Sequence, residues 1–267
     1  MKEKSNITYC TVNGSALQLD VFYPRKKANG IAIVFVHGGG WRSGNRFQHH
    51  PLAQQLAFLG YTVFTPAYRL STEALYPAAI YDIKSVIKWV RAHAKKYKIK
   101  PDKISIAGFS AGGELAAFVG NTNYITAFDG NDCNKKISSA VNAIIDLDGT
   151  LSFVHPESGE GDDSKRKSAA TLWFGYSKKE NPELWKAASP LTYAGENTVP
   201  TLFINSAVER MHAGRDDYLK ILDTYKIYNE VHTFENSPHS FILFNPWFEP
   251  AINYMDEFLK KVFNKNG

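Results

Sequence analysis

Apolar and polar positions along the chain follow two alternating patterns. Residues 31–36 are apolar throughout, which is typical of a strand buried on both faces of a parallel sheet. Residues 81–97 instead carry apolar side chains at helical spacing along one stripe. Because strands that alternate with such helices form parallel sheets, the pattern predicts an α/β fold.

The remaining segments continue this alternation. Two strands with alternating polarity, at residues 7–12 and 16–23, flank Asn13 and Gly14, which is a hairpin signal. Further strands are predicted at residues 61–65, 103–107, 141–146, 201–205 and 230–234. Further helices are predicted at residues 51–59, 114–119, 216–225 and 249–262. The expected architecture is a mostly parallel central sheet with helices on both faces.

The length of the chain suits one domain over residues 1–267, with an insertion at residues 149–200. The 267 residues are 44% hydrophobic, which is enough for a sizeable core. The segment 149–200 precedes the penultimate strand and is too long for a bare connection. We predict that it partly covers the candidate site described below. The alternative is a peripheral excursion with a small core of its own.

Charge and cysteine content narrow the class of protein. The basic residues behind the net charge of +5 are scattered over loops and helix ends, so no nucleic-acid-binding stripe is expected. No apolar run approaches the length of a membrane span, so none is expected either. Cys10 and Cys133 are far apart and lack metal-site spacing, which leaves a disulfide and two free thiols both open. No signal peptide is present as written. The chain is therefore either cytoplasmic or the mature form of an exported protein, and its oligomeric state is left open.

The candidate nucleophile is Ser110. It stands in a Gly-x-Ser-x-Gly pattern, between Gly108 and Gly112, after a predicted strand and before a predicted helix. A strand that runs directly into a helix needs a sharp turn with small residues beside its apex. The apex serine is then exposed as a nucleophile, because this is the structural context of a nucleophile elbow.

A serine hydroxyl needs a base to remove its proton, and His239 suits that role. It lies in a turn-rich loop directly after the last predicted strand, where the base of this arrangement is expected. The other histidines fit worse, because they fall on predicted helices, inside a strand, in the insertion, in the loop before a helix or at the head of a glycine loop.

The glycine loop after the strand at residues 31–36 is a candidate oxyanion hole. Its sequence is His37-Gly38-Gly39-Gly40, and backbone N–H groups there are open to a ligand. We predict Gly39, Gly40 and Ala111, the residue after the nucleophile, as the donors. A phosphate loop is excluded because the glycines lack the spacing of the dinucleotide motif and of the P-loop.

The acid that orients the histidine has several candidates. The usual position is the loop after the strand at residues 201–205, which makes Glu209 the first choice. Asp148, at the end of the preceding strand, is the alternative. Asp216 lies further along and is expected to begin a helix, where acids favour the dipole.

Together these motifs resemble the α/β-hydrolase superfamily across nearly the whole chain. They are His37 to Trp41, residues 66–70, residues 108–113 and residues 237–241. Within the superfamily the chain resembles the acetyl esterase and acetylxylan or feruloyl esterase group, related to hormone-sensitive-lipase-like esterases. That group typically shows Gly-x-x-Asp in the acid loop, whereas this chain has Ser206 to Glu209. The resemblance implies ester hydrolysis through an acyl-enzyme, often on acetylated plant polysaccharides.

The expected function is removal of small acyl groups, acetyl or feruloyl, from a small-molecule or polysaccharide ester. No metal or organic cofactor is expected to be required. Trp41 and Trp247 are predicted to flank the substrate, since aromatic faces suit sugar rings, although core packing is the alternative. Two other functions stay open: a peptidase or amidase of the same fold, and a non-catalytic carbohydrate-binding relative.

Overall fold

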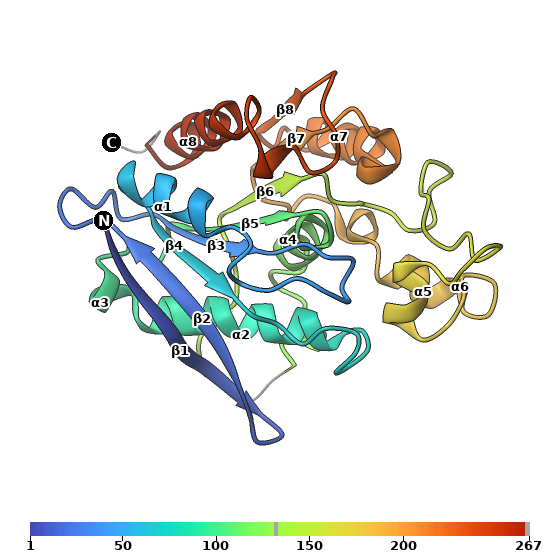
Figure 1. Cartoon of the computed structure of the whole chain (residues 1–267), viewed down its shortest axis with the longest axis horizontal. Helices are drawn as coiled ribbons and strands as arrows, with labels where there is room; N and C mark the ends of the chain where they lie inside the picture. Colours follow the sequence, from blue (N-terminus) through green and yellow to red (C-terminus); the bar gives the residue numbers. More distant parts are fainter. Residues whose placement is uncertain (131–132, 265–267) are drawn as a thin grey trace.

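The centre of the computed structural model is one eight-stranded sheet within the described residues, 1–130 and 133–264. Its order is β1-β2-β4-β3-β5-β6-β7-β8, and the pairs from β4 to β8 are parallel (Figure 1). The strands are β1 (Lys2–Val12), β2 (Ser15–Tyr23), β3 (Ala32–Val36), β4 (Thr62–Pro66), β5 (Ile104–Phe109), β6 (Ala143–Leu147), β7 (Thr201–Asn205) and β8 (Asn229–Thr233). The predicted strands and the mostly parallel sheet are confirmed.

The antiparallel edge is the hairpin of β1 and β2. Its turn residues, Asn13 and Gly14, both have positive φ, at 50° and 82°. Two such residues in succession are what a tight hairpin turn requires, and asparagine and glycine tolerate that conformation best. Strand β2 then pairs antiparallel with β4, which joins the hairpin to the parallel part of the sheet.

Helices cover both faces of the sheet. One face packs against α1 (His50–Phe58) and α8 (Phe248–Asn264). The other packs against α2 (Ala78–Ala92), α4 (Ala111–Asn121) and α7 (Arg215–Thr224). The single helix predicted at residues 81–97 is divided, because His93 leaves helical geometry between α2 and the short α3 (Ala94–Tyr97).

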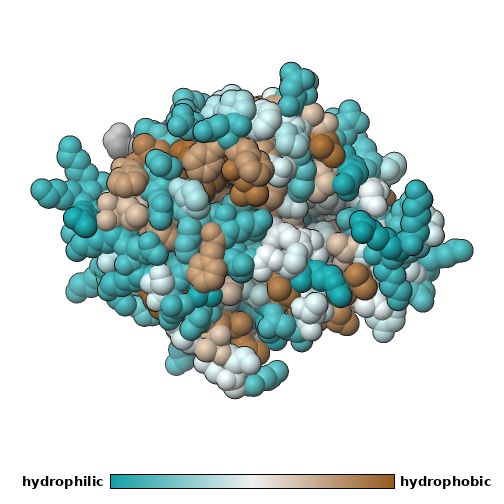
Figure 2. Space-filling view, in the orientation of Figure 1, coloured by the Kyte–Doolittle hydropathy of each residue, from teal (hydrophilic) through white to brown (hydrophobic). Residues whose placement is uncertain are grey.

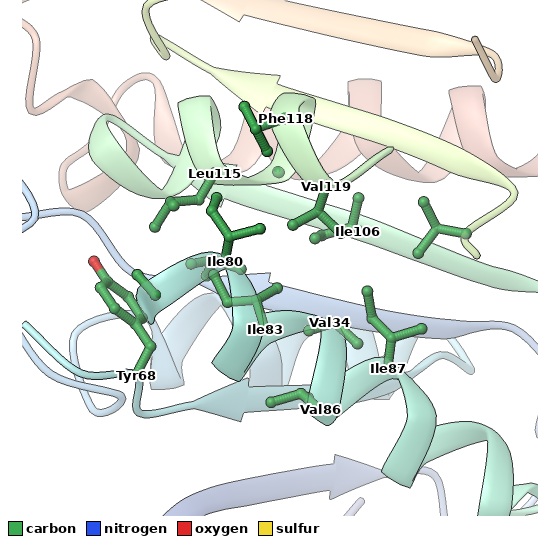
Figure 3. Packing of buried hydrophobic residues seen from close by; sticks show 14 of the residues in the cluster. Val34, Tyr68, Ile80, Ile83, Val86, Ile87, Ile106, Leu115, Phe118 and Val119 are labelled. Atoms are coloured by element: carbon green, nitrogen blue, oxygen red, sulfur yellow. The ribbon is translucent and has the colours of Figure 1, made fainter. Parts of the chain in front are cut away.

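The larger core lies between α2, α4 and the strands β3 and β5. Figure 3 shows Ile83 of α2 beside Val34 of β3, with Leu115 and Val119 of α4 and Ile106 of β5 across from them. All five side chains are fully buried. Burial of each contributes about 1.5–3 kcal/mol, so this packing fixes α4, the helix that follows Ser110, against the sheet.

The segment 149–200 holds two short helices, α5 (Ala169–Phe174) and α6 (Pro182–Ala187). Figure 1 shows both beyond the carboxyl ends of the central strands. Phe153, Trp173, Phe174 and Trp185 are buried together there. The short 3-10 helices are η1 (Thr126–Phe128), η2 (Pro190–Tyr193), η3 (Glu209–His212) and η4 (Phe241–Leu243).

Two further features concern the whole chain. Cys10 of β1 and Cys133 form a disulfide with their Cα atoms 5.7 Å apart. Among the helices of the described residues, none combines the length and apolar character needed to cross a membrane.

Candidate active site

Ser110 stands at a sharp turn between β5 and α4. Its φ of 56° and ψ of −122° are strained for a residue with a side chain. The turn needs glycine on both sides: a Cβ on Gly108 would lie 1.9 Å from the carbonyl oxygen of Gly112, and a Cβ on Gly112 would lie 2.2 Å from that of Val36. The strain persists because Ser110 N–H donates to the Leu147 carbonyl at 2.8 Å, which ties the turn to β6.

His239 connects Ser110 to a carboxylate. Its Nε2 lies 2.8 Å from Ser110 Oγ, and its Nδ1 lies 2.8 Å from Asp148 Oδ2. With the proton on Nδ1, the imidazole donates to Asp148 and its Nε2 is free to accept the serine proton. Phe109 stacks on the imidazole at 4.9 Å between ring centroids, which holds the plane of the ring.

Asp148 is fully buried and follows β6 in a left-handed conformation, with φ at 55°. Its other oxygen, Oδ1, accepts the Ser206 N–H at 2.8 Å, and His212 Nδ1 lies 3.6 Å from the same oxygen. Burial raises the pKa of Asp148, but interactions with His212, His239 and Ser206 outweigh it and hold the pKa below its ordinary value. Asp148 is therefore ionised at neutral pH.

Glu209, the acid preferred from the sequence, does not reach His239. It begins η3, exposed, four residues after the end of β7, and lines a separate hollow with Arg215 and Asp216. Asp216 is also placed elsewhere, since its carboxylate accepts from Arg215. The alternative prediction, Asp148, is the one that the geometry supports, because its Oδ2 lies 2.8 Å from His239 Nδ1.

The predicted oxyanion donors divide into two groups. Gly40 and Ala111 line the same cavity as Ser110, so their prediction as donors stays open to test. Gly39 lines the neighbouring groove instead, and its carbonyl accepts the N–H groups of Arg42 and Ser43. Gly40 has φ at 60°, a conformation in which glycine has no steric penalty.

His37, at the start of the glycine loop, anchors the loop to Tyr68. Its buried imidazole stacks on Tyr68 at 4.4 Å, and the Tyr68 hydroxyl donates to the His37 carbonyl at 3.0 Å. Burial lowers the pKa of His37 to about 4. It is therefore neutral at physiological pH, and its role is to shape the loop.

Trp41 and Trp247 lie in different places. Trp41 lines the Ser110 cavity, but it is 96% buried, stacks on Trp173 at 4.9 Å and donates its indole N–H to Glu114 at 2.9 Å. Its contacts are mostly those of a core residue. Trp247 packs partly buried against the cluster beneath α8 and is not among the described residues that line this cavity. The substrate role predicted for Trp247 therefore has no support in the geometry.

Several lining residues were not predicted from the sequence. The cavity of about 200 Å³ also has Thr150, Gly159 and Glu160 of the 149–200 segment on its wall, with Arg210 and Met211 of η3. None belongs to a recognisable motif. Their position depends on how two irregular segments fold over the strand ends, and periodicity carries no signal for that.

Two buried carboxyl groups, those of Glu114 and Asp146, are not among the described residues that line the Ser110 cavity. Burial raises the pKa of Glu114 well above its ordinary value, with the nearby Asp146 adding to the rise. Burial likewise raises the pKa of Asp146, whose Oδ1 accepts the Gly149 N–H at 2.7 Å. Within residues 1–130 and 133–264, no group of three or more His, Cys, Asp or Glu side chains is arranged to hold a metal ion.

Comparison with known proteins places this site in a family. A model of the BD-FAE family matches residues 19–212, more than half of the chain. The chain belongs to the BD-FAE family. That match spans the glycine loop, Ser110, Asp148 and η3, and it ends before His239.

Curated relatives of this BD-FAE member include a probable carboxylic ester hydrolase, LipM, of Mycobacterium tuberculosis. The two are 40% identical over 113 residues, 41% of this chain and 26% of LipM. The acetyl esterase of Salmonella paratyphi B is 36% identical over 95 residues, 35% of this chain and 29% of the relative. The chain thus matches well under half the length of these relatives.

Solved structures match over nearly the whole chain. A truncated carbohydrate esterase from gut microbiota aligns with a TM-score of 0.80 at 23% identity and covers 97% of both chains. Esterase 2 of Thermogutta terrifontis, with butyrate bound, aligns with a TM-score of 0.79 at 25% identity and covers 97% of this chain and 94% of its own. These likenesses show that the BD-FAE member has the α/β-hydrolase fold, as its sequence motifs indicate.

Proposed function

We propose that the protein is a serine carboxylester hydrolase that removes small acyl groups, foremost acetyl, from carbohydrate. The observation that supports it is the relay from Ser110 through His239 to Asp148, made of two 2.8 Å hydrogen bonds. It ends in a cavity where backbone N–H groups of Gly40 and Ala111 can hold a developing oxyanion.

Acylation begins when Ser110 Oγ attacks the carbonyl carbon of the ester and its proton passes to His239 Nε2. Negative charge develops on the carbonyl oxygen and is held by the N–H groups of Gly40 and Ala111. Asp148 keeps the other proton on Nδ1 and stabilises the imidazolium. Collapse of the tetrahedral intermediate breaks the bond to the alcohol, which leaves with the proton from Nε2.

Deacylation repeats these steps with water. His239 Nε2 takes a proton from a water molecule, and the resulting hydroxide attacks the acyl group on Ser110. The bond to Ser110 Oγ then breaks, Oγ regains the proton from Nε2, and the carboxylic acid is released. The relay is unchanged at the end, as catalysis requires.

The dimensions of the cavity support a small acyl group. Its volume of about 200 Å³ is below the roughly 300–1,000 Å³ of sites that enclose drug-sized ligands. An acetyl group suits this volume better than a feruloyl group. The names of two comparison proteins, an acetyl esterase and a carbohydrate esterase, favour the same substrate class.

The direct test compares p-nitrophenyl acetate with p-nitroacetanilide, which carry the same acyl group on an ester and an amide. We expect turnover of the ester and little of the anilide. Ser110→Ala should lose nearly all activity and keep at most the rate enhancement, a few thousandfold over the reaction in water, that an oxyanion hole alone supports. Preferred cleavage of the anilide would favour a peptidase or amidase, and no turnover of either would favour a binding protein.

The disulfide extends the proposal to the compartment. Bonds of this kind persist in oxidising environments and are rare in the cytosol. The Cys10–Cys133 bond therefore supports an exported protein rather than a cytoplasmic one. Thiol titration of protein taken from its native host decides this, since two free thiols would overturn it.

A further inference from the structure

An open groove lies beside the catalytic cavity. It has a volume of about 860 Å³, against about 200 Å³ for the cavity. Gly40, Gly159, Glu160 and Arg210 line both, so the two hollows adjoin one another. A group bound in the groove would therefore lie next to the ester that is cleaved in the cavity.

Four basic side chains line this groove from three separate segments. Arg42 follows the glycine loop, Arg166 and Lys167 precede α5, and Arg210 belongs to η3. All four residues are exposed. Within the described part of the chain, none has a side-chain hydrogen bond or an ion pair, and Lys167 affects Glu180 only through a longer-range charge interaction.

The acidic residues of the groove are already engaged. Glu160 Oε2 accepts the Ala170 N–H at 3.0 Å, and Asp162 Oδ1 accepts the Ser164 N–H at 3.2 Å. These bonds hold the carboxylates in place without cancelling their charge, so the four basic side chains, which have no ion-pair partner among the described residues, outnumber the two acidic ones along the groove. Figure 2 shows hydrophilic side chains interspersed with paler and brown ones at the end of the molecule where α5 and α6 lie.

We propose that this cationic groove binds a carboxylate on the alcohol part of the ester, so that the substrate is an acylated acidic carbohydrate, a uronate. This deepens the proposed function and rests on it. The small cavity at Ser110 takes the acyl group, and the wider groove is left for the sugar. Arginine presents several donors in a plane that matches a carboxylate, and an unpaired guanidinium is available for it.

The test uses two acetylated substrates that differ at one carbon: acetylated methyl glucuronoside, with a carboxylate at C6, and acetylated methyl glucoside, with a hydroxymethyl group there. We expect kcat/KM to be about tenfold higher for the acidic sugar at low salt, which corresponds to about 1.4 kcal/mol. At ~1 M NaCl, where the screening length is about 3 Å, the ratio should fall towards one.

Variants of the groove locate the effect. The ratio of kcat/KM for the acidic sugar to kcat/KM for the neutral sugar should fall severalfold in Arg210→Gln and in the double variant Arg166→Gln/Lys167→Gln. Each rate is divided by the rate at which the same variant hydrolyses p-nitrophenyl acetate. The matched control is Lys186→Gln. This exposed lysine of α6 does not line the groove, and its loss removes one positive charge, as Arg210→Gln does. The control should keep the wild-type ratio.

Three outcomes would overturn the inference. The first is a wild-type ratio of one or less while p-nitrophenyl acetate is cleaved, which leaves the esterase proposal intact. The second is a preference for p-nitrophenyl hemisuccinate over the acetate with no preference among the sugars, which would place the carboxylate on the acyl side. The third is a loss of preference in Lys186→Gln equal to that in the groove variants.

A binding measurement separates failure of this inference from failure of the proposed function. Calorimetric titration with trigalacturonate and with neutral xylotriose needs no turnover. Salt-sensitive binding of the acidic sugar alone, weakened by Arg210→Gln, supports the groove even if no ester is hydrolysed. Equal binding of both sugars, or of neither, contradicts it.

Discussion

Replacement of Asp148 by asparagine tests the relay most sharply. The side chain keeps its size and burial, but one oxygen becomes an amide N–H₂ group. Ser206 N–H faces Oδ1 at 2.8 Å and can only donate, so the amide oxygen of the variant is expected to take that side. The N–H₂ group then faces His239 Nδ1.

This orientation reverses the imidazole. A donor opposite Nδ1 favours the tautomer with its proton on Nε2, 2.8 Å from Ser110 Oγ, where it blocks acceptance of the serine proton. The stabilising charge on the imidazolium is lost as well. We therefore expect kcat to fall by about 10³–10⁴, roughly 4–5.5 kcal/mol of barrier, with a smaller effect on KM.

The assay is steady-state hydrolysis of p-nitrophenyl acetate, with thermal melting to confirm that Asp148→Asn folds. Glu209→Gln is the matched control, because it makes the same chemical change at the exposed start of η3. It should keep kcat within about twofold. Mild loss in Asp148→Asn together with severe loss in Glu209→Gln would refute the assignment of the acid.

Three further predictions concern the oxyanion loop, a buried acid and the disulfide. Gly40→Val should lower kcat for p-nitrophenyl acetate by about a hundredfold or more, because valine does not tolerate the φ of 60° and the backbone would shift the Gly40 N–H away from the oxyanion. An unchanged rate would show that the Gly40 N–H is not an oxyanion donor. Burial raises the pKa of Glu114 above 4.5, so the stability that its protonated form contributes is present below that pH and lost as the pH rises. Glu114→Gln cannot ionise and can still accept from Trp41, so its melting temperature should exceed wild type at pH 8 and match it near pH 4; a lower value at pH 8 would contradict this. Cys133→Ser removes the disulfide between two residues 123 positions apart, and chain entropy predicts a loss of stability of up to about 5 kcal/mol. This loss would be measured as a lower midpoint of urea unfolding, and an unchanged midpoint would show that the disulfide adds no stability.

The fold was predictable because its signals are local and repeated. The strand predicted at residues 201–205 coincides with β7, and the other parallel strands agree to within two residues at either end, because an uninterrupted apolar run is hard to place except in a buried parallel strand. The edge strand β1 begins five residues earlier than its predicted start at residue 7. The division of the predicted helix at His93 was missed. Its apolar stripe continues across the break, so periodicity does not register the change in backbone direction.

The surroundings of the site were less predictable, because they depend on contacts between segments without periodicity. Trp41 and Trp247 look alike in sequence, as tryptophans close to catalytic motifs. Trp41 lines the cavity, where Trp173, far along the chain, stacks on it. Trp247 packs against the cluster beneath α8 instead. Arg210 was not identified for the same reason, since the role proposed for it depends on Arg42, Arg166 and Lys167 lining the same groove.

The position of the acid follows from strand register, which the sequence does not state. Phe109 of β5 pairs with Leu147 of β6, so Ser110 and Asp148 are the next residues on two adjacent parallel strands and leave the sheet side by side. Leu147 in turn pairs with Ile204 of β7, which brings Ser206 N–H to Asp148 Oδ1. Glu209, four residues beyond β7, lies exposed at the start of η3 instead. The register thus favours the acid after β6, and a sheet shifted by one residue would turn Asp148 to the opposite face and leave the histidine without it.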